Sequence, residues 1–171
     1  MANTYLLIGS TTLTSTTASV VFSSIPSTYT DLKLVVVLRS NENFDYLNLI
    51  LNTTQNTGFS SMWGMWSGSA ASSATRSDGN ISATSNNSVY TANTFGIGEI
   101  YIPNYADGYT KKFSSEGAQE QASLTSVFQQ FISNNWNSTA AINRIEVVAG
   151  DGGTKRFMNG SKLFLYGIKN T

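Results

Sequence analysis

The chain contains neither histidine nor cysteine, which leaves carboxylates as the groups to consider for acid–base chemistry. Glycoside hydrolysis would need two of them, roughly 5–9.5 Å apart across a cleft. Their spacing along the chain singles out no pair, and an acidic residue on an outward strand face is most simply solvated or paired across strands. The candidates are Glu42, Asp45, Glu99, Glu116 and Glu120. We therefore predict that the chain is not an enzyme and has no catalytic residues.

Other reactive patterns are incomplete. A serine nucleophile would lack a histidine to activate it. The sequence GDGGT at 150–154 has the glycines of a phosphate loop but not the Lys-Ser/Thr of a P-loop, which favours a hairpin turn. Asp107, Asp151 and the Asn-rich loops offer oxygen ligands, but their spacing matches no known calcium loop. We expect no cofactor and no metal site.

The composition indicates one domain with an unusually uncharged surface. A chain of 171 residues is a normal single-domain size. Charged residues make up 12 %, against roughly 25 % in ordinary soluble domains, and ten basic residues balance ten acidic ones. A neutral, charge-poor surface is weakly protected against association, so we expect much of it to meet other protein surfaces. The sequence has no basic stripe, so we expect no binding to nucleic acid, and no apolar run reaches transmembrane length.

Short apolar, β-branched or aromatic runs bounded by turn residues dominate the chain, which is typical of strands. The strongest is DLKLVVVLRS at 31–40, whose alternation with charge only at its ends predicts a central, covered strand. An Asp-Gly pair at 107–108 predicts a hairpin between two of the runs. The other expected strands are 4–9, 18–22, 46–51, 61–67, 96–103, 109–115, 142–150 and 162–168.

Two further segments need separate treatment. The sequence LTSVFQQFI at 124–132 matches a helical apolar spacing, but its β-branched and aromatic content and its strand-rich neighbours favour a strand. The Ser/Gly/Asn-rich stretch at 67–88 predicts a long exposed loop. About eight to ten short strands without a convincing long helix predict one all-β domain over 1–171, an antiparallel, jelly-roll-like β-sandwich.

The sequence MWGMW at 62–66 places two tryptophans and two methionines in a strand beside that stretch. Alternation puts Met62 and Trp66 on one face and Trp63 and Met65 on the other, so both faces need cover. One interpretation is a fully buried strand. The other is a contact site, because Trp and Met are enriched at protein interfaces, and we hypothesise that Trp63 or Trp66 is exposed in the monomer.

The candidate contact surface extends beyond this strand, and a third use of exposed aromatic rings is stacking on sugars. A receptor- or glycan-binding module would use the tryptophans with nearby tyrosines. The complete set of candidate contact residues is Phe59, Met62, Trp63, Met65, Trp66, Tyr105 and Tyr109.

Four segments carry a resemblance to a known group of proteins: SSIPSTYTDLKLVVVLRSN, GEIYIPNYADG, WNSTAAINRIEVVAGDGG and KLFLYGIKN. The chain resembles small β-rich proteins of tailed marine bacteriophages nearly end to end, with 53–95 the least matched. The resemblance implies a virion component, of a group variously described as fibre-like, appendage or capsid-surface proteins. It implies no catalytic residues.

The length of the expected domain favours one of these roles. The first strand is expected from residue 4 and the last to residue 168, which leaves little chain for the anchor and shaft of a tail fibre. We therefore expect a decoration (cement) protein on the capsid surface rather than on the tail. Its expected partners are the major capsid protein and other copies of itself, with a trimer suggested by virion symmetry. The alternative is an appendage or tail-fibre-type module that binds a host-surface glycan.

Overall fold

The computed structural model describes residues 4–43, 46–53, 58–67, 70–76, 81–120, 127–150 and 152–169. Within them, twelve strands form two antiparallel sheets. The larger sheet has the order β1 (Tyr5–Thr12), β12 (Lys162–Ile168), β3 (Asp31–Leu38), β8 (Gly96–Ile102), β9 (Lys111–Glu120), β10 (Val127–Trp136), β5 (Phe59–Ser67) and β6 (Ala70–Arg76). The smaller sheet has the order β2 (Ser19–Phe22), β11 (Ile145–Ala149), β4 (Tyr46–Leu51) and β7 (Ile81–Thr84).

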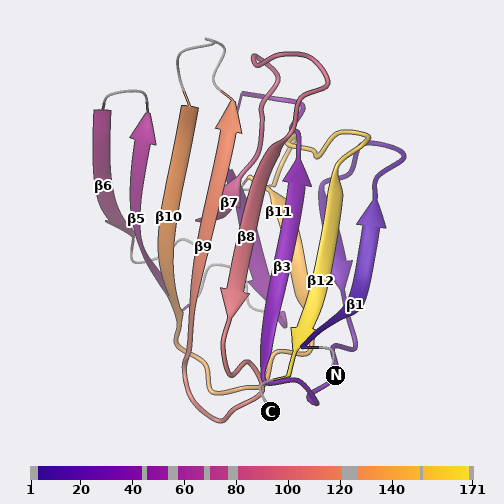
Figure 1. The fold of residues 1–171 in the computed structure, drawn as a ribbon, viewed down its shortest axis with the longest axis vertical. Coiled ribbons are helices and arrows are strands. Elements are labelled where there is room, and N and C mark those ends of the chain that lie inside the picture. The colour runs from indigo at the N-terminus through magenta and orange to yellow at the C-terminus, as the bar shows by residue number, and fades with distance from the viewer. Residues whose placement is uncertain are drawn as a thin grey trace.

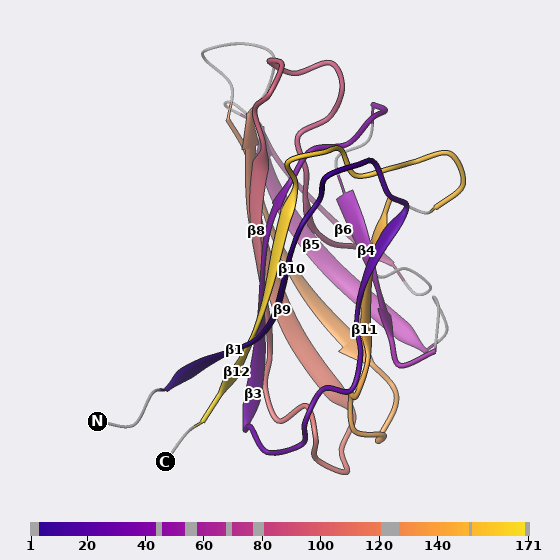
Figure 2. The ribbon, with the colours of Figure 1, turned by 90° about the vertical axis from the view of Figure 1, so that its right-hand side faces the viewer.

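The two sheets are stacked as the layers of a sandwich. Figure 1 looks onto the larger sheet, with β6 at its left edge, β1 at its right edge and the smaller sheet behind it. Figure 2 turns the molecule and shows β4 and β11 as a second layer beside β3, β8 and β12. The prediction of a single all-β antiparallel sandwich is confirmed, although the described strands number twelve rather than eight to ten. None of the described residues belongs to a helix that could cross a membrane.

The hydrophobic core lies between the sheets. On β3, the alternation in the sequence sends Leu32, Leu34, Val36 and Leu38 inward, each at most 1 % exposed. They share one cluster with inward residues of the smaller sheet, including Leu49 of β4. Complete burial of each such side chain contributes roughly 1.5–3 kcal/mol. Because β3 pairs with β12 on one side and β8 on the other, the prediction of a central strand at 31–40 is confirmed.

The hairpin predicted around Asp107–Gly108 is also present. The pairs between β8 and β9, such as Tyr101 with Ser114 and Ile97 with Ala118, are all centred on that dipeptide. The ladder stops at Tyr101, however, so the connection is a wider loop over 103–110. The buried Lys111 amine fixes this loop by donating to the carbonyl oxygens of Asp107 and Tyr109, each at 2.5 Å.

Three expectations need correction or completion. The prediction of a loop throughout 67–88 is wrong, because β6 and β7 form within it. The strand favoured at 124–132 is confirmed from residue 127 onward as β10, and 124–126 lie outside the described residues. At 150–154 the glycines at 150, 152 and 153 have positive φ, as a turn requires. The turn is not a hairpin, because β11 and β12 belong to different sheets.

Candidate contact surface

Most of the exposed large apolar side chains lie on one face of the protein. In the larger sheet, alternate side chains enter the core and the others point away from the smaller sheet. We call the second set the outer face. Ten large apolar side chains are exposed among the described residues, and seven of them belong to this face, at 38–59 % exposure: Tyr5, Leu7, Met62, Trp66, Ile97, Tyr101 and Phe131.

The strand register arranges the outer face in rows, because directly paired residues of an antiparallel sheet share a face. The first row crosses all eight strands through Leu7, Tyr166, Lys33, Tyr101, Ser114, Ser133, Met62 and Thr75. The second row runs beside it through Phe164, Val35, Glu99, Glu116, Phe131, Gly64 and Ser73. A third row contains Ile97 and Trp66.

The predicted split of the tryptophan strand β5 is present in the structure. Met62 and Trp66 are exposed on the outer face at 59 % and 48 %. Trp66 packs edge-on against Phe131 of β10, with ring centroids 5.7 Å apart. Trp63 and Met65 point to the opposite side and are half-buried. The strand is therefore neither fully buried nor an equal contact site on both faces.

Two predicted contact residues belong to the core instead, which corrects the sequence prediction. Phe59 is 1 % exposed and stacks on Trp136 at a centroid distance of 5.9 Å. Tyr105 is fully buried, and its hydroxyl donates to the carbonyl oxygen of Pro26. Burial raises the pKa of the Tyr105 phenol above its ordinary value. Tyr109 is 78 % exposed, but it lies in the 103–110 loop rather than on the sheet.

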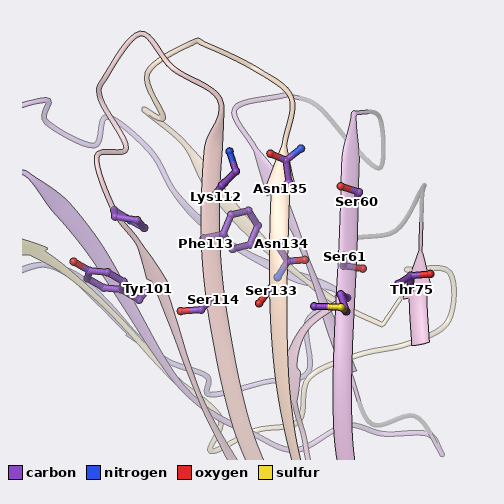
Figure 3. Close-up of a pocket in the computed structure, with 12 residues that line it drawn as sticks. Ser60, Ser61, Thr75, Tyr101, Lys112, Phe113, Ser114, Ser133, Asn134 and Asn135 are labelled. Carbon is purple, nitrogen blue, oxygen red and sulfur yellow. The ribbon is translucent and has the colours of Figure 1, made fainter. Parts of the chain in front are cut away.

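A hollow of about 630 Å³ is present in the outer face over β8, β9, β10, β5 and β6. Its middle is the stretch of the first row where the side chains are small, Ser114 and Ser133, between Tyr101 on one side and Met62 on the other. Lys112, Asn135 and Ser60 follow along one end (Figure 3). The hollow thus has apolar walls with hydroxyl, amide and ammonium groups between them.

A hydrogen bond to Asp31, at the start of β3, fixes the position of the Tyr101 side chain. Its hydroxyl donates to the carboxylate of Asp31 at 2.6 Å, and the other carboxylate oxygen accepts the Asn104 backbone N–H at 2.9 Å. Asp31 is 2 % exposed. This hydrogen bond, helped by burial, raises the pKa of Tyr101 to about 12, so the phenol stays neutral and oriented at ordinary pH.

Charges lie in the middle of the outer face. Lys33 forms an ion pair with Glu99, with 2.6 Å between nitrogen and oxygen, and the hydrogen bond between them raises the pKa of Lys33. The direct cross-strand neighbour of Glu99 on β9 is Glu116. Two like charges in that position repel each other. Lys33 neutralises Glu99, while among the described residues Glu116 and Lys112 each lack an ion-pair partner within 4 Å.

Of the five candidate carboxylates, the structure brings together only this pair of described residues. The Glu99 side chain is 44 % exposed in its ion pair, which is unlike the apolar pocket that prepares a carboxyl group as a general acid. Glu120 lies elsewhere, bonded to the Thr91 hydroxyl, and Asp45 and Asp151 lie outside the described residues. In the described part of the chain no three acidic side chains form a metal cluster. The absence of enzyme activity stays a prediction.

Beneath the hollow, the inner side of β9, β10 and β5 contains polar as well as apolar residues. Around Ile132, four neighbouring side chains each have a buried polar atom without a hydrogen-bond partner: Ser115, Gln130, Asn134 and Trp63. Such groups weaken packing because each costs about 1–3 kcal/mol if left dry.

Sequence patterns identified the methionine and tryptophan of β5 but missed Tyr5, Leu7, Ile97, Tyr101 and Phe131. The signal was present in β8, GIGEIYI, where an isoleucine and a tyrosine occupy the face opposite the core isoleucines. Comparison of the chain with protein-family models, curated proteins and solved structures finds no match. The class defined by fold and surface is an all-β antiparallel sandwich whose exposed large apolar side chains lie mostly on one outer sheet face.

Proposed function

We propose that this protein is a structural subunit of a bacteriophage virion that decorates the capsid and works through protein–protein contacts. The observation that carries the proposal is the concentration of exposed apolar side chains on the outer face. Seven of the ten exposed large apolar side chains among the described residues share this face, on both sides of its charged middle. Exposed apolar side chains gathered on one face mark protein–protein interaction sites.

We also infer a jelly-roll core. The support is the strand order: β1, β12, β3 and β8 form one half, and β2, β11, β4 and β7 face them. Eight strands connected as two Greek keys define that arrangement, which recurs in viral capsid and lectin domains. The hairpin of β9 and β10 and that of β5 and β6 then extend one sheet beyond the eight-stranded core. The outer face owes its width to these two hairpins.

Low surface charge supports a role in an assembly. Twenty charged side chains are spread over 171 residues, and two of those on the outer face neutralise each other as Lys33 and Glu99. A subunit whose faces become buried avoids the cost of desolvating unpaired charges. A particle surface offers many symmetric copies of one neighbour, which suits a module that binds without catalysis.

Quantitative mass spectrometry of purified phage particles tests the virion proposal. Hundreds of copies per particle are expected for a protein on the head surface, and about a dozen would move it to the tail. Complete absence from washed particles would contradict the proposal. Particles assembled with Ile97→Glu should hold fewer copies, while Val21→Glu, an exposed change on the smaller sheet, should leave the number unchanged.

A second candidate function is glycan binding, because the hollow combines an aromatic wall with hydroxyl and amide groups. Sugars are bound by such a combination of ring stacking and polar contacts. Tyr101, 38 % exposed, is the aromatic wall of the hollow, and Trp66, 48 % exposed, lies on the same face four residues along β5 from Met62. A glycan array probed with the wild-type chain, Tyr101→Ala, Trp66→Ala and Val21→Ala checks it. Signals that vanish in Tyr101→Ala or Trp66→Ala but not in Val21→Ala support recognition, and silence across the array supports the scaffold role.

A further inference from the structure

We propose that the outer face binds a second copy of this chain, forming a twofold dimer in which Glu116 of each copy meets Lys112 of the other. The inference deepens the proposed function and rests on its claim that this face works by protein contact. It names the occupant of the face and the axis that relates the two copies. A dimer replaces the trimer suggested by virion symmetry.

The first argument is the size of the face. Six strands from β3 to β6, about 4.8 Å apart, and about nine residues at roughly 3.3 Å each span an area of roughly 29 by 30 Å. That is about 870 Å², close to the roughly 800 Å² that each partner buries in a standard stable interface. A face of this size and composition can hold a second copy without help from the loops.

The second argument is that the face is complementary to itself. In a twofold interface each contact occurs twice, so one surface must contain both members of every pair. On β10, Phe131 and Asn135 lie two residues to either side of Ser133 in the first row. An axis that runs along the first row, across the strands, therefore places Phe131 of one copy over Asn135 of the other, at the end of the hollow.

The same axis pairs the charges. On β9, Glu116 and Lys112 lie two residues to either side of Ser114, which belongs to the first row. A half-turn about this row brings each Glu116 over the partner's Lys112. Glu116 is beside Glu99 and has no ion pair of its own in the described structure. A cation from outside the monomer would relieve that repulsion.

Side-chain size permits the approach. Ser114 and Ser133 lie on the proposed axis, where each residue faces its own copy. Small side chains at these two positions let the sheets approach toward the roughly 10 Å spacing of packed layers. Lys33, Tyr101 and Met62 belong to the same row and therefore also face their own copies, and Glu99 compensates the charge of Lys33 there. The second row contributes Phe131 as the ridge that enters the hollow of the partner.

Sedimentation velocity of the purified chain over a range of concentrations tests the dimer. We expect the mass of two chains at high concentration, and a dissociation constant raised roughly tenfold by Glu116→Lys or by Lys112→Glu, because each change replaces two ion pairs by repulsion. The double variant Glu116→Lys/Lys112→Glu should recover wild-type association. Val21→Glu, on the outer side of the smaller sheet, serves as the matched control and should not change it.

Cross-linking tests the axis. The chain has no cysteine, so Ser133→Cys supplies a unique thiol at the proposed axis, and a bismaleimide spanning about the 10 Å between sheets should join two chains. Val21→Cys should not be joined. A monomer at every concentration, a three-chain mass, or no rescue by the double variant would overturn the dimer. So would capture of a glycan or another virion protein by the outer face in its place.

The two proposals fail separately. A dimer that is absent from phage particles would uphold the inference and contradict the virion role. A chain that is monomeric and uncross-linked in solution, yet present in hundreds of copies per particle, would do the opposite.

Discussion

The two isoleucines of β8 offer a direct test of which sheet face is the core. Ile100 is fully buried opposite Leu34 of β3, whereas Ile97, three residues earlier in the same strand, is 57 % exposed on the outer face. Replacing isoleucine by alanine removes three carbons, about 2.4 kcal/mol of transfer free energy when fully buried. For Ile100 the cavity left behind raises the loss in unfolding free energy to roughly 3–5 kcal/mol.

For Ile97→Ala the expected loss is about 1 kcal/mol, because 57 % of the side chain already meets solvent and no closed cavity forms. Both changes lower β-propensity equally, so that effect cancels in the comparison. Urea unfolding of dilute protein, followed through the summed fluorescence of the three tryptophans, of which Trp136 is buried, measures both values. The dependence on urea should stay the same in both variants. Equal losses, or a larger one for Ile97→Ala, would refute the assignment of the faces.

Three other changes have defined outcomes. The hydrogen bond to Asp31 raises the pKa of Tyr101 from 10.0 to about 12. Its contribution to the free energy of unfolding is therefore complete below pH 10 and is lost as the pH rises toward 12. In an ultraviolet titration of tyrosinate, Tyr101→Phe should lack the phenol that ionises last in the wild-type protein. Gly96→Ala should lower the free energy of unfolding in urea by about 1–3 kcal/mol, because the new Cβ would lie 2.8 Å from a backbone nitrogen. The control Gly108→Ala has nothing within 4 Å of its new Cβ, so its free energy of unfolding should stay within about 0.5 kcal/mol of the wild-type value. Arg39→Met removes a guanidinium that donates to three carbonyl oxygens of the loop before β8, so hydrogen exchange in that loop should quicken at least about tenfold.

Most strands were predictable because their chemistry alternates. β3 and β8 each bury one apolar face, and the period of two appears directly in DLKLVVVL and GIGEIYI. β6 gave no such signal, since AASSATR contains no large apolar residue and its side chains from 70 to 75 are exposed at the edge of the sheet. Its pairing with β5 depends on backbone hydrogen bonds, which leave no pattern in the sequence.

The contact surface was predictable only in part. Parity along β5 assigns Met62 and Trp66 to one face, and the same parity extended to Phe59 would have placed it on the inner side with Trp63. Tyr105 lies in a loop without periodicity, and its partner Pro26 is far away in the chain. The rows of the outer face depend on strand order, and no local pattern shows that β5 pairs with β10.

The pairing of β1 with β12 determines when this protein can mature during synthesis. Residues 5–12 form their ladder only with residues 162–168, and β3 needs the same late strand on one side. Until residues 162–168 have been translated, the leucine-rich side of β3 lacks its complete sheet, and its exposed apolar surface can associate with other nascent chains. Closure must then bring sequence-distant segments together, which is slow for β topologies. Chaperones that cover this apolar surface until β12 has been translated should therefore raise the yield of folded protein when synthesis is fast.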